Sequence, residues 1–218
     1  MTNQSVLIIG AIWVEPNSSA AGSRMMQLIE QFLKQNWKIT FASSSQKSEK
    51  AIDLIPLGVN EVSIELNSSS FDDFIKQLQP TIVMFDRFMV EEQFGWRVAE
   101  NCSNAIRILD TEDLHFLRRV RHQQYKKGEN FTTDALLKSD EAKREIASIL
   151  RSDMSLIIST FEMELLKSVF KIDENILFYL PFLLNKIDEH QTKKWRSFEA
   201  VRGRLISWQA STKLVSSE

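Results

Sequence analysis

The sequence predicts an α/β fold in which helices cover both faces of one parallel sheet, the doubly wound arrangement. Short apolar runs, such as SVLIIG at residues 5–10, alternate with longer amphipathic stretches up to about residue 180. Several of these runs are continuously apolar, which is typical of strands buried on both faces. Parallel strands need a crossover connection, usually a helix, and the alternation supplies one repeatedly. No internal repeat is visible.

The first half of the chain is predicted to hold four strands and three helices. After the strand at 5–10, apolar residues recur at helical spacing over residues 20–35, and KITFAS follows as a second strand. VSIEL alternates strictly between apolar and polar residues, which favours a strand nearer an edge of the sheet. The remaining expected elements are a strand at 62–66 (this VSIEL run), a helix at 71–78, a strand at 81–86 and a helix at 89–101.

The second half continues the same alternation and then loses it. AIRILD and MSLIIST are the next apolar runs, and NILFYLP is the last, stopped by Pro181. We expect strands at 105–110, 154–160 and 175–181, and helices at 111–127, 134–151 and 161–169. Beyond about residue 185 only one amphipathic piece and a polar, serine-rich tail remain. We therefore expect a single domain over 1–184, followed by a linker and tail over 185–218 with no second domain.

Composition excludes several classes of protein. The net charge is −2, so the overall charge does not indicate binding to nucleic acid or to an anionic membrane. A single cysteine, Cys102, excludes an internal disulfide and is expected to be a small buried apolar residue. The N-terminus MTNQSVLIIG lacks a basic region, and its apolar run is too short for a signal peptide or a membrane span. These features predict a cytoplasmic protein.

Unusual polar residues fall where the predicted strands end. GAIWVEPNSSAAG follows the first strand, DRF the fourth, DTEDLH the fifth, and STFE the sixth. In an open parallel sheet, ligands bind outside the carboxyl ends of the strands. We therefore expect these four stretches to share one edge of the sheet and to form a ligand-binding site there.

The loop VEPNSSAAG at residues 14–22 is the first candidate. Pro16 and Asn17 favour a turn, and Ser18 or Ser19 can cap the following helix. The small residues after the cap leave the first helical turn bare, which suits an anionic or hydroxyl-rich ligand. Capping alone explains the stretch equally well, and it contains neither glycine-rich phosphate motif. The candidate ligand-binding residues here are Glu15, Asn17, Ser18, Ser19, Ala20 and Gly22.

DTEDLH at residues 110–115 is the second candidate. Asp110 and His115 are the candidate catalytic residues, as a general base or a hydroxyl-binding carboxylate with a neighbouring imidazole. The alternative is a helix start in which Asp110 or Thr111 caps and the next acids complement the dipole, and we favour it for Glu112. The spacing matches no standard metal motif. The further candidate ligand-binding residues are Asp86, Arg87, Thr111, Asp113 and Arg118.

Two of these candidates have a competing structural explanation. Asp86 and Arg87 form either a local ion pair or part of the ligand edge. Arg118 lies one helical turn from His115 in a basic run that is typical of a solvated face, yet it could meet a phosphate. Near STFE, Ser159 or Thr160 is expected to cap a helix, with Glu162 close to its start.

The segments VLIIG, WVEPNSSAAGSRM, VMFDRFMVEEQFGWRV, RILDTEDLHFLR and IISTFEMELL resemble the N-terminal half of bacterial GT-B glycosyltransferases of the family 4 or family 1 type. These enzymes have two facing Rossmann-like domains. The resemblance covers residues 5–199, and it implies that this half binds the acceptor and that Asp110 lies near the reaction centre. Val14 stands where family members often carry proline.

The resemblance further implies a nucleotide-sugar donor, bound mainly by a C-terminal domain, with no metal or other cofactor. Because the tail after YLPFLL does not read as the start of such a domain, we expect a truncated or split product. It would be inactive unless a separate polypeptide completes it, and it would tend to self-associate. The alternative is a stand-alone binding or regulatory domain. A nucleotide-dependent oxidoreductase is disfavoured by the missing glycine fingerprint.

Overall fold

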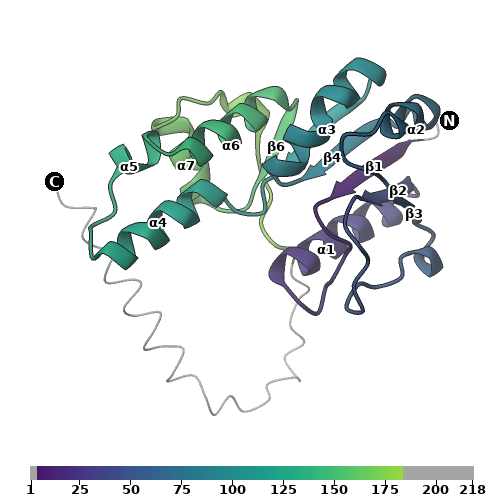
Figure 1. Ribbon diagram of the computed structural model, residues 1–218, viewed down its shortest axis with the longest axis horizontal. Coiled ribbons are helices and arrows are strands. Elements are labelled where there is room, and N and C mark those ends of the chain that lie inside the picture. The colour runs from purple at the N-terminus through teal and green to yellow at the C-terminus, as the bar shows by residue number, and fades with distance from the viewer. Residues whose placement is uncertain (1–3, 184–218) are drawn as a thin grey trace, which may run out of the picture. The chain divides into compact units, whose positions relative to one another are not determined.

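The computed structural model describes residues 4–183 and contains one sheet of seven parallel strands (Figure 1). Its spatial order is β3-β2-β1-β4-β5-β6-β7. The strands are β1 (Ser5–Gly10), β2 (Lys38–Ser43), β3 (Asn60–Ser63), β4 (Ile82–Asp86), β5 (Ile106–Asp110), β6 (Met154–Ile157) and β7 (Leu177–Tyr179). The prediction of a parallel α/β sheet is therefore confirmed, and VSIEL does lie at an edge.

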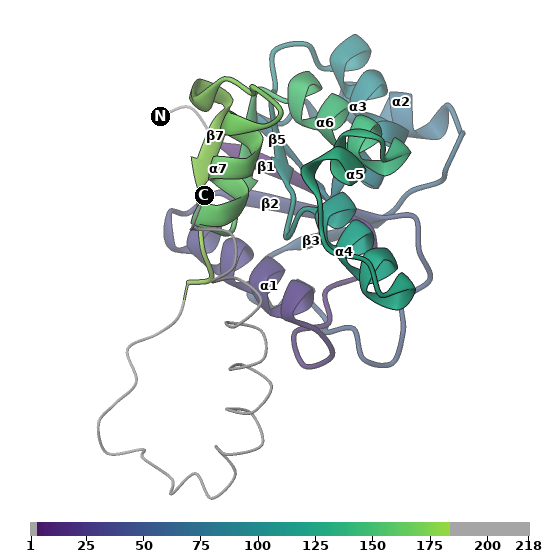
Figure 2. The same cartoon turned by 90° about the vertical axis from the view of Figure 1, so that its left-hand side faces the viewer.

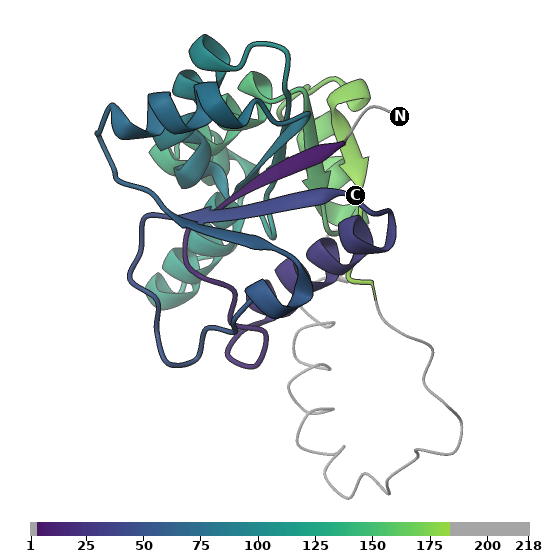
Figure 3. The same cartoon turned by 90° about the vertical axis from the view of Figure 1, so that its right-hand side faces the viewer.

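Helices cover both faces of this sheet, as the doubly wound prediction requires. They are α1 (Ala20–Lys34), α2 (Ser70–Leu78), α3 (Phe88–Asn101), α4 (His115–Lys127), α5 (Thr133–Leu137), α6 (Asp140–Arg151) and α7 (Thr160–Ser168), with short 3₁₀ turns at Ile55–Leu57 and Glu174–Ile176. Figure 2 and Figure 3 show α1 on one side of the sheet and α2 and α3 on the other.

The alternation of strand side chains builds two separate cores. Val6 and Ile8 face α1 and pack with its Met25 and Ile29. Leu7 and its alternating neighbours face the opposite side and pack with apolar residues of α2, α3, α4, α6 and α7. Residues at i and i+2 of a strand share a face, so one continuous apolar run supplies both cores.

The strand order places a reversal point at the centre of the sheet. From β1 the chain moves outward through β2 to β3, then crosses back to β4 on the other side of β1. In doubly wound sheets the crevice outside such a reversal point is where ligands bind. The carboxyl ends of β1 and β4 are therefore the place at which to look for a site.

Some element boundaries differ from the sequence prediction. The expected helix at 134–151 is two helices, because Ser139 is extended and its hydroxyl accepts the Ala142 amide as a new N-cap. β3 covers 60–63 rather than 62–66, and β6 ends at Ile157. The expected linker and tail at 185–218 lie outside the described residues. No helix in the described range is long and apolar enough to cross a membrane.

Helix α4 begins later than predicted and is capped from a distance. One of the two interpretations of DTEDLH, favoured for Glu112, put a cap at Asp110 or Thr111 and the next acids in the first turn, and the structure contradicts it. The helix starts at His115, and its first amides are bound by two distant carboxylates. Glu145 of α6 accepts the amides of His115 and Phe116 at 3.2 and 3.0 Å, and Glu162 of α7 accepts that of Leu114 at 3.0 Å.

Candidate functional site

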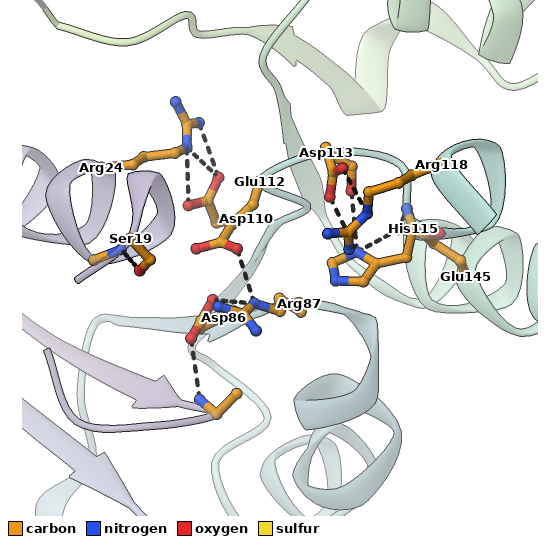
Figure 4. A network of polar contacts seen from close by, with 12 residues as sticks. Ser19, Arg24, Asp86, Arg87, Asp110, Glu112, Asp113, His115, Arg118 and Glu145 are labelled. Atoms are coloured by element: carbon orange, nitrogen blue, oxygen red, sulfur yellow. Dashed lines mark hydrogen bonds and ion pairs between the residues drawn. The ribbon is translucent and has the colours of Figure 1, made fainter. Parts of the chain in front are cut away.

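Charged side chains from the ends of β4 and β5 and from α1 meet at the reversal point (Figure 4). Asp86 ends β4 and Asp110 ends β5, and the two are direct neighbours in the sheet register. The Ala11 amide, just after β1, donates to Asp86 Oδ2 at 3.1 Å. The Arg87 amide donates to the Asp110 carbonyl at 2.9 Å. We call Arg24, Asp86, Arg87, Asp110 and Glu112 the strand-end site.

Arg24 and Asp110 form an enclosed ion pair within this site. The Arg24 guanidinium donates from Nε and Nη2 to Asp110 at 2.8–3.1 Å, and from Nη1 to the Leu180 carbonyl at 2.9 Å. The exposed fractions are 1% for Arg24 and 0% for Asp110. Burial raises the pKa of Asp110 even though Arg24 opposes the shift. Asp110 is therefore a framework residue in this structure rather than a group open to a ligand.

Arg87 joins the two remaining carboxyl groups. Its Nε donates to Glu112 Oε2 at 2.8 Å and lies 3.4 Å from Asp86 Oδ1. Asp86 Oδ1 is buried and accepts no hydrogen bond from any described residue. Buried polar atoms in native structures nearly always have a partner. An oxygen at the reversal point that is paired with the Arg87 charge but accepts no hydrogen bond therefore indicates a position for a hydrogen-bond donor.

The backbone at Arg87 and Glu112 is in unusual conformations. Arg87 has φ 77° and ψ 157°, a region that is essentially restricted to glycine. Glu112 has φ 60°, in the left-handed region. Non-glycine residues held in such regions cost on the order of 1–3 kcal/mol each and cluster at functional sites. The two residues that contact each other across the site are thus both held in strained conformations.

The pKa of Glu112 is raised to about 7, first by burial and then by the Asp86 charge, which together outweigh Arg87. Burial also raises the pKa of Asp86, with Asp110 adding to the shift and Arg87 opposing it. The sequence assigned Glu112 to the first helical turn, and the structure instead places it among the charges of the site. Because its pKa is about 7, Glu112 gains or loses its proton close to neutral pH.

His115 lies in a second group of contacts, separate from the strand-end site in Figure 4. Its Nδ1 is 3.1 Å from the Asp113 carbonyl and 3.7 Å from Glu145 Oε1. Burial lowers the pKa of His115, but hydrogen bonding to Glu145 and the charges of Glu145 and Asp113 outweigh it and leave the pKa raised. Arg118 pairs with Asp113 at 3.1 Å on the surface. His115 and Asp110 are therefore not brought into contact.

The loop after β1 is packed closely onto the start of α1. Ser19 is the N-cap, as the sequence allowed, and its hydroxyl accepts the Gly22 amide at 3.0 Å. A Cβ on Gly22 would lie 2.1 Å from the Glu15 carbonyl oxygen, so glycine permits this close approach. Glu15 also contacts the Ser48 hydroxyl. Asn17, Ser18, Ser19 and Ala20 are exposed and remain available to a ligand.

Thr111 has a structural role in the sheet. Its side chain is fully enclosed, and its hydroxyl donates to the Leu156 carbonyl of β6 at 2.9 Å. We therefore leave Thr111 out of the ligand-binding set proposed below. Two other sequence expectations are confirmed: Ser159 caps α7, and Cys102 is buried.

Sequence reasoning missed Arg24, Glu145 and the role of Glu112. Arg24 stands beside Met25 on the face of α1 that packs against the sheet. An arginine on a buried helix face needs a charged partner, so this position was a usable signal. Its partner is 86 residues away, and periodicity gives no means of naming it.

Two surface hollows lie away from the strand-end site. One, of about 470 Å³, is lined by α4, α5 and α6 and mixes both signs of charge, as with Arg119 and Glu141. The other, of about 550 Å³, lies at the amino ends of the strands, opposite the strand-end site, near Lys38 and Pro80. The described residues contain no group of three His, Cys, Asp or Glu side chains that could hold a metal ion.

The sequence matches no family model and no curated protein. Solved structures do match. One is the apo form of the lipopolysaccharide outer core galactosyltransferase WaaB, with a TM-score of 0.51 and 13% identity over 84% of this chain and 48% of that one. Another is a sucrose-phosphate synthase from Thermosynechococcus elongatus, with a TM-score of 0.52 and 13% identity over 82% of this chain and 48% of that one.

The fold is that of one half of a GT-B glycosyltransferase. The resemblance seen in the sequence is thereby confirmed at the level of fold, and the likeness is to the N-terminal half. At 13% identity the structural match establishes the fold and no more. The chain spans about half the length of the structures it matches.

Proposed function

We propose that this GT-B half binds the acceptor in a sugar-transfer reaction that uses a nucleotide-sugar donor. The observation that supports it best is the strand-end site, a cluster of charged groups at the reversal point of the sheet in which one buried oxygen of Asp86 accepts no hydrogen bond from the described residues. Sugar acceptors present many hydroxyl groups, and carboxylates and guanidinium groups are the natural partners for such hydroxyls. Asp110 and His115 were the catalytic candidates from sequence.

The residues would divide into a binding set and a framework set. The exposed residues of the loop after β1 (Asn17, Ser18, Ser19 and Ala20) and the half-buried Glu15 would contact the acceptor together with Asp86, Arg87 and Glu112. Arg24 and Asp110 would hold the strand ends in position, and Gly22 would hold the loop against α1. His115, Asp113 and Arg118 would form the outer margin, where Arg118 is 63% exposed and able to reach an anionic group.

The donor would be bound by groups that the described residues do not supply. In transferases of this kind the departing diphosphate must be stabilised and water excluded from the donor. We propose that a donor-binding half in a separate polypeptide provides these functions. Transfer would then require both halves together.

Chemical-shift mapping of the ¹⁵N-labelled chain tests this proposal. Galactose, glucose and short oligosaccharides are added in one series, and UDP-galactose in another. The saccharides are expected to shift the amides of residues 11–15, 17–20, 86–88 and 110–115, and UDP-galactose to have a much smaller effect. As a matched control, Lys38→Ala alters the amino ends of the strands and should leave the map unchanged.

Two results would count against the proposal. If no saccharide shifts the strand-end amides, the chain is not an acceptor-binding half. If a small anion such as phosphate or a protein shifts them while saccharides do not, the stand-alone binding or regulatory domain becomes the better description.

A further inference from the structure

The basic run on α4 is only partly a solvated face. Its sequence, HFLRRVRHQQYKK, holds five lysine and arginine side chains and no acid, although the whole chain has a net charge of −2. Arg118 and Arg119 are exposed and pair with Asp113 and Glu141. Arg121 differs from them, because it is half-buried and makes no direct ion pair with any residue in the described range.

Two aromatic rings hold the Arg121 guanidinium. Its Cζ lies 5.2 Å from the ring centroid of Phe131, in the connection between α4 and α5, and 4.8 Å from that of Phe161, in the first turn of α7. A guanidinium at such distances is attracted to the face of a ring. The two rings are themselves 40% and 50% exposed. The charge is therefore held in one place at the surface, and we call Arg121, Phe131 and Phe161 the stacked-arginine site.

The N–H groups of Arg121 have no acceptor. No residue between 4 and 183 accepts a hydrogen bond from this guanidinium. The acid whose charge acts on Arg121 is Glu162, and its two oxygens already accept the Leu114 amide at 3.0 Å and the Ser159 hydroxyl at 2.9 Å. Burial lowers the pKa of Arg121 and the Glu162 charge opposes this shift, so the guanidinium stays charged at neutral pH.

We propose that the stacked-arginine site binds the phosphate group of a small phosphorylated molecule, and that the exposed parts of Phe131 and Phe161 contact the organic group attached to it. A planar fork of N–H donors matches two oxygens of one anion, and a fork that is already held in place loses less entropy on binding. This site lies outside the strand-end site, and its role does not depend on the proposed function.

Charge favours a phosphate over a carboxylate at this position. Both groups present paired oxygens that fit the fork. A phosphate monoester, however, carries about 1.5–2 negative charges at neutral pH, and α4 contains no acid to repel them. Arg118, one helical turn before Arg121, is 63% exposed and brings a second positive charge to the same face of the helix.

Side-chain Nε–Hε NMR spectra of the ¹⁵N-labelled full chain test this proposal. Inorganic phosphate, glucose 6-phosphate, acetate and glucose are added separately at constant ionic strength. Glucose 6-phosphate is expected to shift the Arg121 Nε–Hε signal saturably and to bind more tightly than inorganic phosphate, because the rings contact its sugar. Acetate should bind more weakly than either, and glucose should leave this signal unchanged.

Three variants separate the fork from the general charge of the helix. Arg121→Gln is expected to weaken glucose 6-phosphate binding about tenfold or more, as measured from the Phe131 and Phe161 amides. Arg121→Lys keeps the charge without the planar fork and should not restore wild-type affinity. Arg119→Gln removes one charge from the same helix and, as the matched control, should bind like wild type. Unchanged amide spectra elsewhere verify that each variant is folded.

Several results would overturn the proposal. Equal affinity in wild type and Arg121→Gln, or an equal loss in Arg119→Gln, would show that the helix acts only through its overall charge. Acetate that binds as tightly as glucose 6-phosphate would overturn the assignment to phosphate, and full rescue by Arg121→Lys would overturn the role of the fork. Binding to phosphatidylcholine vesicles that contain phosphatidic acid, without binding of either soluble phosphate, would overturn the assignment to a small molecule.

Discussion

Arg24 and Asp110 show what a single buried charge pair does in this fold. Bringing two charges out of water is costly, and their attraction offsets that cost only with good geometry and further hydrogen bonds. Here the guanidinium makes several bonds to the carboxylate and one to the Leu180 carbonyl. The pair therefore joins α1, the end of β5 and the segment after β7 at one point.

Arg24→Met is expected to destabilise the protein by about 3–5 kcal/mol, because it leaves Asp110 buried without a partner. Urea unfolding followed by circular dichroism measures the change. Lys143→Met removes an exposed pair with Asp140 and should cost far less, because such pairs are screened by solvent. Equal costs for the two variants would contradict the structural role assigned to Arg24.

Glu112 should make the stability of the protein depend on pH. Its folded pKa of about 7 is above its unfolded value of 4.5. The folded state therefore holds the proton more tightly, and the contribution to stability is present below the unfolded pKa and lost as the pH rises through the folded pKa. Between those two values the loss is on the order of 3 kcal/mol. Glu112→Gln should show a smaller loss over the same range in urea unfolding, and an unchanged pH profile would refute the assignment.

At the scale of elements, the start of α4 depends on acids from other helices. Leu114 occupies the N-cap position and makes no side-chain cap, and Glu145 and Glu162 take the free amides instead. This arrangement ties α4 to α6 and α7 and fixes the direction in which the chain leaves the strand-end site. A hydrogen bond to a charged group contributes about 1.5–3 kcal/mol.

Glu145→Ala is expected to raise the hydrogen-exchange rates of the His115 and Phe116 amides about tenfold or more, because both lose their acceptor. Glu141→Ala, on the same helix, is the matched control and should leave these two amides unchanged. Exchange that is equally slow in wild type and Glu145→Ala would show that α4 does not need the distant cap.

Gly22→Ala tests how the loop after β1 sits on α1. In an exposed helix position, alanine in place of glycine stabilises by about 1 kcal/mol. Here the added Cβ would lie 2.1 Å from the backbone oxygen of Glu15, so we expect a loss of about 1–3 kcal/mol. A gain in stability on thermal unfolding would contradict the close packing.

The limits of sequence reasoning follow from which interactions are local. Strands and helices follow from periodicity, and the Ser19 cap from residue type, because these depend on near neighbours. The start of α4 does not, since its caps, Glu145 and Glu162, lie about 30 and about 48 residues further along the chain. The strand ends predicted from the sequence correctly placed Asp86 and Asp110 next to each other. The position of Glu112 depended on a left-handed backbone that no sequence pattern marked.

At the scale of the whole molecule, the chain has the fold of one half of a GT-B structure and a charged site at the reversal point of its sheet. The likeness to half of WaaB and of a sucrose-phosphate synthase is a likeness of fold. The acceptor-binding proposal rests on the site itself: strained residues, a buried oxygen that accepts no hydrogen bond from the described residues, and a glutamate with a raised pKa.

The most direct test of this account is calorimetric titration of the chain with the saccharide that gives the largest amide shifts, in wild type, Arg87→Ala and Lys38→Ala. The account predicts that Arg87→Ala weakens binding about tenfold or more, because a charged hydrogen-bonding group is lost, and that Lys38→Ala binds like wild type. Binding that survives in Arg87→Ala and is lost in Lys38→Ala would place the site at the amino ends of the strands and contradict the account.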